Sequence, residues 1–252
     1  MDGNGVFGNS RALEIPNRAG AYCRVRGQRR ILPFMNASSP GGNERPGTRL
    51  RWALFWPLLG VGLLWLLAIH QAWSQSNWVA FGVLPRTLSG LPGILTAPLV
   101  HDSWGHLLAN TPSLLGLGVL ALYGYPRATR HAIPVIWLLS GLGVWLFARP
   151  SFHIGISGLT HGLLFYVVAM GLLRRDPLSI VLAIVVFLVF GGMASGIVPG
   201  DAGISFEYHL FGAIAGVIAA VMLARLDPMP PPRLRQDEAE DEEVLPSEHD
   251  RS

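Results

Sequence analysis

Long runs of apolar residues, broken by short polar segments, make up the middle of this chain. A helix needs roughly 20 apolar residues to cross a hydrocarbon core of about 30 Å. Six stretches fit this requirement, at residues 53–73, 103–124, 132–148, 157–174, 178–195 and 206–226. The third and fourth are short, and Pro112 lies inside the second. The pattern therefore predicts six membrane-spanning helices.

The composition agrees with a polytopic membrane protein. Half of the 252 residues are hydrophobic, only 14% are charged, and the mean hydropathy is +0.40. The first 50 residues contain no apolar core of the length that a secretory signal peptide requires, so we expect the first span to direct insertion. The single cysteine, Cys23, excludes a disulfide framework and a thiolate metal site within one chain.

The two ends of the chain carry opposite charge. Residues 1–51 hold nine arginines and three acids, whereas residues 227–252 hold nine acids and three arginines. We expect a basic, disordered tail at 1–51, a membrane domain at 52–226 and an acidic, disordered tail at 227–252. The basic tail lacks interleaved aromatic residues, so no nucleic-acid partner is expected, and the lipid bilayer accounts for membrane-proximal charge.

The arginines also predict the orientation of the spans. Lys and Arg accumulate on the cytoplasmic side of short loops. Four arginine groups fall on one side of a six-span bundle: positions 45, 49 and 51; 127 and 130; 174 and 175; and 225, 233 and 235. The opposite loops carry only Arg86 and Arg149. We therefore expect a multi-pass protein of a bacterial plasma membrane, with both termini cytoplasmic.

Five polar residues begin otherwise apolar spans. They are His101, His106 and Asn110 at the second span, Ser157 at the fourth and His209 at the sixth. The predicted orientation puts all five at the extracytoplasmic end. Polar groups are costly in lipid and usually mark function, so this common depth predicts one shared polar site.

Ser157 is a candidate nucleophile. It lies between two glycines in Gly155-Ile156-Ser157-Gly158, at the start of a span. Taken alone, this motif is more typical of small-residue helix packing than of a catalytic serine. A serine hydroxyl also needs a neighbouring base before it can attack a carbonyl.

His209 is the candidate base. Gly212 and Gly216 follow it at i+3 and i+7, so all three residues share one face of the sixth span. Small residues at this spacing let two helices approach closely. We expect this face to pack on the fourth span, which carries Ser157.

Two further polar residues are candidates for stabilising an oxyanion. His106 and Asn110 are four residues apart and share a helical face, and the Ser157 amide is a third candidate donor. His101 precedes His106 by five residues and is expected to brace the entry loop.

Three motifs in this order, His101-x4-His106-x3-Asn110, Gly155-x-Ser157-Gly158 and His209-x2-Gly212-x3-Gly216, resemble those of the rhomboid family of intramembrane serine proteases. The resemblance covers roughly residues 52–226 and implies an all-α, six-helix bundle. It further implies that Ser157 and His209 form a catalytic dyad, that His106, Asn110 and the Ser157 backbone line the oxyanion site, and that single-span membrane proteins are cleaved near the outer surface. No cofactor is implied, and no oligomeric state is predicted.

The chain departs from the family pattern at two places. Many rhomboids carry a tyrosine four residues after the nucleophile, which packs on the catalytic histidine, whereas this chain has His161. An imidazole there is expected to stack on His209 or to perturb its titration. The Trp-Arg pair of the first outer loop is also missing, and residues 84–93 are instead apolar and rich in turn residues.

Three acids are candidates for a third catalytic member. Glu207 points about 200° away from His209 on a helix and is a poor partner. Asp102 and Asp201 remain loop candidates, although the resemblance favours a dyad. The loop 196–205, rich in glycine, is expected to be a mobile cap over the site.

Other functions remain open from the sequence alone. The main alternative is a rhomboid-like, non-catalytic module that binds membrane proteins. A metal- or haem-binding protein using His101, His106, His161 and His209 is less favoured, because His101 and His106 do not share a helical face and no His-Glu-x-x-His pair occurs. Transport is disfavoured because no charge pair is evident inside the spans.

Overall fold

The computed structural model describes residues 23–25, 28–30, 46–200 and 203–227. It divides into two units, residues 1–44 and 45–252. In the first unit, β1 (Cys23–Val25) and β2 (Gln28–Arg30) form an antiparallel hairpin in which Cys23 lies opposite Arg30. Most of the two tails for which disorder was predicted lies outside the described residues.

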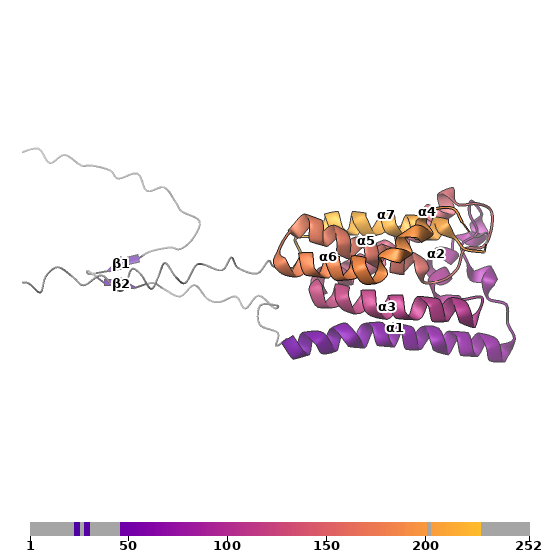
Figure 1. Ribbon diagram of the computed structural model, residues 1–252, viewed down its shortest axis with the longest axis horizontal. Helices are drawn as coiled ribbons and strands as arrows, with labels where there is room; N and C mark the ends of the chain where they lie inside the picture. Colours follow the sequence, from indigo (N-terminus) through magenta and orange to yellow (C-terminus); the bar gives the residue numbers. More distant parts are fainter. Residues whose placement is uncertain (1–22, 26–27, 31–45, 201–202, 228–252) are drawn as a thin grey trace, which may run out of the picture. The chain divides into compact units, whose positions relative to one another are not determined.

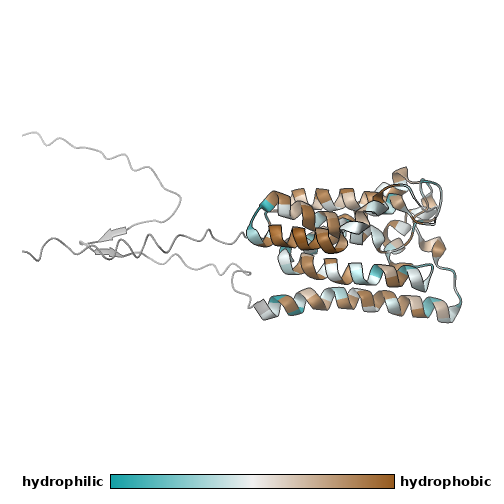
Figure 2. Ribbon diagram, viewed as in Figure 1, coloured by the Kyte–Doolittle hydropathy of each residue, from teal (hydrophilic) through white to brown (hydrophobic). Residues whose placement is uncertain are grey.

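The second unit is a bundle of six apolar helices (Figure 1). These are α1 (Pro46–Ser74), α3 (Trp104–Gly124), α4 (Pro126–Phe147), α5 (Ser157–Arg174), α6 (Pro177–Phe190) and α7 (Phe206–Leu223). Hydrophobic residues cover the helices, and hydrophilic residues gather mainly near their ends (Figure 2). The six predicted spans and the all-α class of this unit are confirmed, and the protein is an integral, multi-pass membrane protein.

Helix α5 is the central helix of the bundle and contacts α3, α4, α6 and α7. Its contact with α7 is close because glycines line it. A Cβ atom on Gly212 would lie 2.1 Å from the carbonyl oxygen of Gly158, and one on Gly216 would lie 2.0 Å from that of Gly162. Only hydrogen fits at these two positions, so the α5 and α7 backbones are in direct contact.

Helix α4 begins at Pro126, six residues before the predicted start of the third span. Proline is favoured in the first turn of a helix because its missing N–H has no partner there. The carboxylate of Asp227 accepts hydrogen bonds from the backbone N–H groups of Arg127 (3.1 Å) and Ala128 (2.9 Å). A residue of the predicted acidic tail therefore caps α4 from about 100 positions away.

The fifth span is not a single α-helix. The α-helical part, α6, ends at Phe190, and the 3₁₀ segment η4 (Gly191–Ile197) continues the span. Gly191 and Gly192 explain the change, because glycine has a low helix propensity. A 3₁₀-helix rises about 2.0 Å per residue, so η4 extends the span further than the same number of α-helical residues would.

The loop between α1 and α3 folds against α4. It contains η1 (Val79–Phe81), η2 (Leu88–Gly90), α2 (Gly93–Thr96) and η3 (Ala97–Leu99). Indole N–H groups of Trp137 and Trp145 donate to the carbonyl oxygens of Leu95 and Thr87, at 3.2 and 2.9 Å. The apolar segment 84–93 is thus held on the protein, where its backbone polar groups find partners.

Candidate functional site

A cavity of about 600 Å³ opens where α3, α5 and α7 begin. Its lining includes four of the predicted site residues and His161. The five are His106, Asn110, Ser157, His161 and His209. Three helices that are far apart in the sequence therefore contribute polar groups to one concave surface.

Ser157 is the first residue of α5, and it is buried, with 7% of its surface exposed. The segment before it is held by a hydrogen bond from the Gly155 N–H to the Ala97 carbonyl (2.9 Å). Gly155 has φ of +100°, a conformation that disfavours side chains. A Cβ atom there would also lie 2.7 Å from His106 Nε2. Glycine at 155 thus allows the turn and the close approach of His106.

Gly158 has a separate steric role, because a Cβ atom there would lie 2.6 Å from the ring of Tyr208. Tyr208 precedes His209 on α7 and is fully buried. The glycine after the serine therefore lets α7 approach the start of α5.

The ring of His209 is oriented by a backbone carbonyl. Its Nδ1 lies 3.0 Å from the carbonyl oxygen of Gly196, in η4. A carbonyl oxygen only accepts, so Nδ1 donates its hydrogen, and the neutral ring carries its lone pair on Nε2. This is the tautomer that a general base requires.

His161 stacks on His209, which is one of the two outcomes that the sequence predicted. The ring centroids are 3.9 Å apart and the planes differ by 7°. His161 Nδ1 lies 2.8 Å from the Ser157 carbonyl, and its Nε2 lies 3.0 Å from the Met193 carbonyl. The ring therefore joins α5 to η4 while covering one face of His209.

His106 and Asn110 occupy successive turns of α3. The Asn110 side-chain amide donates to the His106 carbonyl (3.1 Å), and the Ser103 hydroxyl accepts from the His106 N–H (3.1 Å) as the helix cap. Both side chains line the cavity near Gly155, and both carry N–H groups suited to an anionic oxygen.

His101 lies beside the cavity rather than in its lining. Its ring meets that of His106 edge to face, with centroids 5.0 Å apart, and its Nε2 lies 3.5 Å from the Ile156 N–H. It thus connects the entry loop to the residue before Ser157.

Lowering the pH from 7 to 4 is expected to destabilise the fold through His101. Burial, together with the positive charge of a protonated His106, lowers the pKa of His101 from 6.5 to about 4. Below pH 6.5 the unfolded chain takes up a proton that the folded chain takes up only near pH 4. The associated stability is present above pH 6.5 and falls by about 3 kcal/mol as the pH drops to 4. The free energy of unfolding of His101→Gln should decline less over this range; an equal decline would contradict the assignment.

The two described acidic candidates for a third catalytic member pair with residues other than His209. Asp102 contacts His106, at 2.9 Å between Oδ1 and Nδ1. Glu207 pairs with Arg149, at 3.4 Å between Oε1 and Nε. Asp201 is outside the described residues. The group that contacts His209 Nδ1 is the Gly196 carbonyl.

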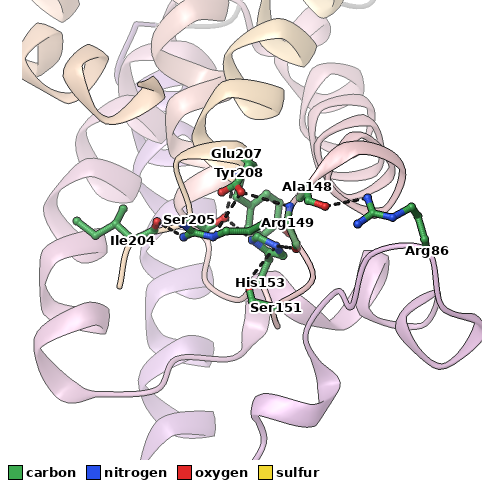
Figure 3. Close-up of polar contacts among 9 residues, drawn as sticks. All are labelled: Arg86, Ala148, Arg149, Ser151, His153, Ile204, Ser205, Glu207 and Tyr208. Atoms are coloured by element: carbon green, nitrogen blue, oxygen red, sulfur yellow. Dashed lines mark hydrogen bonds and ion pairs between the residues drawn. The ribbon is translucent and has the colours of Figure 1, made fainter. Parts of the chain in front are cut away.

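Sequence reasoning left His153 without a role. The structure buries its side chain in the lining of the cavity and places it in a network of polar contacts (Figure 3). The Tyr208 N–H donates to Ser205 Oγ (3.2 Å), which lies 2.6 Å from His153 Nδ1, and His153 Nε2 lies 3.0 Å from the Arg149 carbonyl. Burial lowers the pKa of His153, partly offset by the Arg149 carbonyl and the charge of Glu207. The network ties the segment before Ser157 to the start of α7. Its one sequence signal was a histidine close to the serine motif.

Comparison with known proteins agrees with this architecture. The family model of the rhomboid domain matches residues 89–226. An uncharacterized protein of Mycobacterium tuberculosis is 40% identical over 202 residues, covering 73% of this chain and 84% of the relative. An uncharacterized protein of Mycobacterium leprae is 34% identical over 196 residues, covering 71% and 77%. This chain is therefore a member of the rhomboid family.

Proposed function

We propose that this protein is an intramembrane serine endopeptidase that cleaves single-span membrane proteins near the extracytoplasmic surface. The observation that carries the proposal is the shared cavity, which brings a hydroxyl, an imidazole in the base tautomer and two N–H donors to one site. These are the components that acyl transfer requires.

In the proposed reaction, Ser157 Oγ attacks the carbonyl carbon of the scissile peptide while His209 Nε2 accepts the hydroxyl proton. The tetrahedral intermediate collapses, His209 returns the proton to the leaving amine, and an acyl-enzyme remains. Water then attacks the ester, with His209 again taking and returning a proton. The open cavity, with its polar lining, supplies the route by which water reaches the ester.

The carbonyl of Gly196 supports a dyad without an acid. When His209 gains a proton, its Nδ1–H still donates to the Gly196 oxygen, so the carbonyl dipole stabilises the imidazolium. The stacked ring of His161 limits rotation of His209 and keeps Nε2 available. The buried carboxylate of Glu207 pairs instead with the exposed Arg149, so this ion pair has a structural role.

The depth of cleavage follows from the orientation that the arginines predict. The cavity lies at the end of the bundle where α3, α5 and α7 begin. Arginine-rich segments flank the opposite end. With that end in the cytoplasm, the proposed site faces the outside.

Labelling with a fluorophosphonate tests the proposal. The protein should react covalently at Ser157 and cleave a model single-span substrate, and Ser157→Ala should lose both properties, with cleavage falling by about 10⁴-fold or more. Ser113→Ala is the matched control, since it removes another hydroxyl from the same cavity and should keep both.

Two results would overturn the proposal. One is undiminished cleavage by Ser157→Ala. The other is a folded protein that binds the substrate but neither reacts with the probe nor cleaves, which would identify a non-catalytic binding module.

A further inference from the structure

The carboxylate of Asp102 contacts the ring that the proposed function places at the oxyanion. Asp102 lies just before α3, and its Oδ1 is 2.9 Å from His106 Nδ1. Burial raises the pKa of Asp102, but the hydrogen bond and charge of His106, with the hydrogen bond of Ser103, more than offset this and lower it overall. Asp102 is therefore ionised at neutral pH.

The other ring nitrogen of His106 faces the segment that carries Ser157. A Cβ atom on Gly155 would come within 2.7 Å of His106 Nε2 and within 3.9 Å of Asn110 Nδ2. Gly155 lies two residues before Ser157, so Nε2 is the nitrogen on the side of the proposed nucleophile. An oxyanion bound beside Ser157 would meet this atom.

The contact with Asp102 determines which nitrogen of a neutral His106 carries the hydrogen. A carboxylate only accepts hydrogen bonds, so Asp102 requires a hydrogen on His106 Nδ1. A neutral imidazole has one N–H, and a neutral His106 in this geometry would point the lone pair of Nε2 at the oxyanion. Only the imidazolium donates from both nitrogens.

We infer that Asp102 holds His106 as an imidazolium, so that the oxyanion of the tetrahedral intermediate meets a charged donor rather than a neutral one. Charge-assisted hydrogen bonds are roughly twice as strong as neutral ones. Asp102 is a positioning residue in this scheme, because it acts through His106 and does not touch the substrate. The inference rests on the proposed function and adds to it the protonation state of the oxyanion donor.

Several other titratable groups surround His106, but the carboxylate in contact with its ring is that of Asp102. Among the described residues, His101 meets the ring from the preceding loop and, with a pKa of about 4, is neutral at pH 7. His153 before α5, His161 on α5 and His209 on α7 line the same cavity. Arg149 also lines it, and its charge is opposed by its ion pair with Glu207.

The inference predicts how cleavage depends on pH. Turnover requires a neutral His209 and a charged His106, so the rate should fall at acidic and at alkaline pH. In Asp102→Asn the amide can turn its NH₂ group toward Nδ1, and a neutral His106 can then carry its hydrogen on Nε2. The kcat of Asp102→Asn should be about tenfold lower than that of the unmodified protein at neutral pH. The kcat of the variant divided by that of the unmodified protein should rise as the pH increases.

Two further variants complete the test. Asp102→Glu keeps the negative charge, so its rate of cleavage should still fall at alkaline pH. In His106→Gln the donor does not titrate, so kcat should be lower than in the unmodified protein but should not fall at alkaline pH. A constant ratio of Asp102→Asn to the unmodified protein at every pH would overturn the inference, because a purely structural role changes the rate without changing its pH dependence.

A second readout does not depend on cleavage. In protein labelled with ¹⁵N-histidine, the His106 ring, assigned by the loss of its signals in His106→Gln, should show hydrogens on both nitrogens near neutral pH. In Asp102→Asn it should show one. A singly protonated His106 in the unmodified protein would overturn the inference even if Ser157-dependent cleavage is found, and a doubly protonated ring would support it even if cleavage is not.

Discussion

Replacing His209 by alanine is expected to lower kcat/KM for a single-span substrate by about 10⁴-fold. Without the imidazole, nothing takes the proton from Ser157 Oγ as it attacks, and nothing returns a proton to the leaving amine. The ring also stacks on His161 at 3.9 Å and donates to the Gly196 carbonyl, so its removal loosens η4 as well.

The control for this variant is another histidine of the bundle. His131→Ala removes an exposed imidazole from α4, far along the chain from the cavity residues, and should leave the rate unchanged. Cleavage and thermal unfolding should be measured for both variants in the same detergent. If His209→Ala cleaves within tenfold of the unmodified protein, His209 is not the base.

A methyl group at Gly216 is expected to have the largest effect on stability. The Cβ atom of Gly216→Ala would lie 2.0 Å from the Gly162 carbonyl oxygen, which is backbone and cannot turn aside. Helices α5 and α7 would have to separate, at a cost of about 3 kcal/mol in the free energy of unfolding. The separation would also move His209 away from Ser157, so the rate of cleavage should fall together with stability.

Gly60→Ala is the matched substitution, since it places the same methyl group in another membrane-spanning helix. No atom lies within 4 Å of a Cβ at that position. Alanine is the better helix former, so this variant should be as stable as the unmodified protein or more stable by up to about 1 kcal/mol. Equal stability of Gly216→Ala and Gly60→Ala in reversible unfolding would show that the contact between α5 and α7 tolerates a side chain.

The number of spans could be read from the sequence because the bilayer imposes a length on every apolar segment. Five of the six spans are α-helical throughout, and the fifth is completed by η4. Spacing within the motifs was similarly informative, since residues three, four or seven apart share a helical face wherever a helix forms. The meeting of Ser157, His209, His106 and Asn110 at one end of the bundle was therefore predictable from topology.

Contacts between distant segments decided the rest. Asp227 caps α4 from beyond the end of α7, so the start of α4 could not be read from its own residues. Asp102 was an open candidate for a third catalytic member, and tertiary geometry directs it to His106.

The environment of each histidine likewise depends on backbone far away in the sequence. Gly196 orients His209, the Met193 carbonyl meets His161, and Ser205 meets His153. The sequence by itself determined the spans, the helical faces and the depth of the polar groups, because hydrophobic length and helical period are local properties. The tertiary structure alone decided which nitrogen meets which oxygen, because a hydrogen bond depends on distances of about 3 Å between segments that the sequence keeps apart.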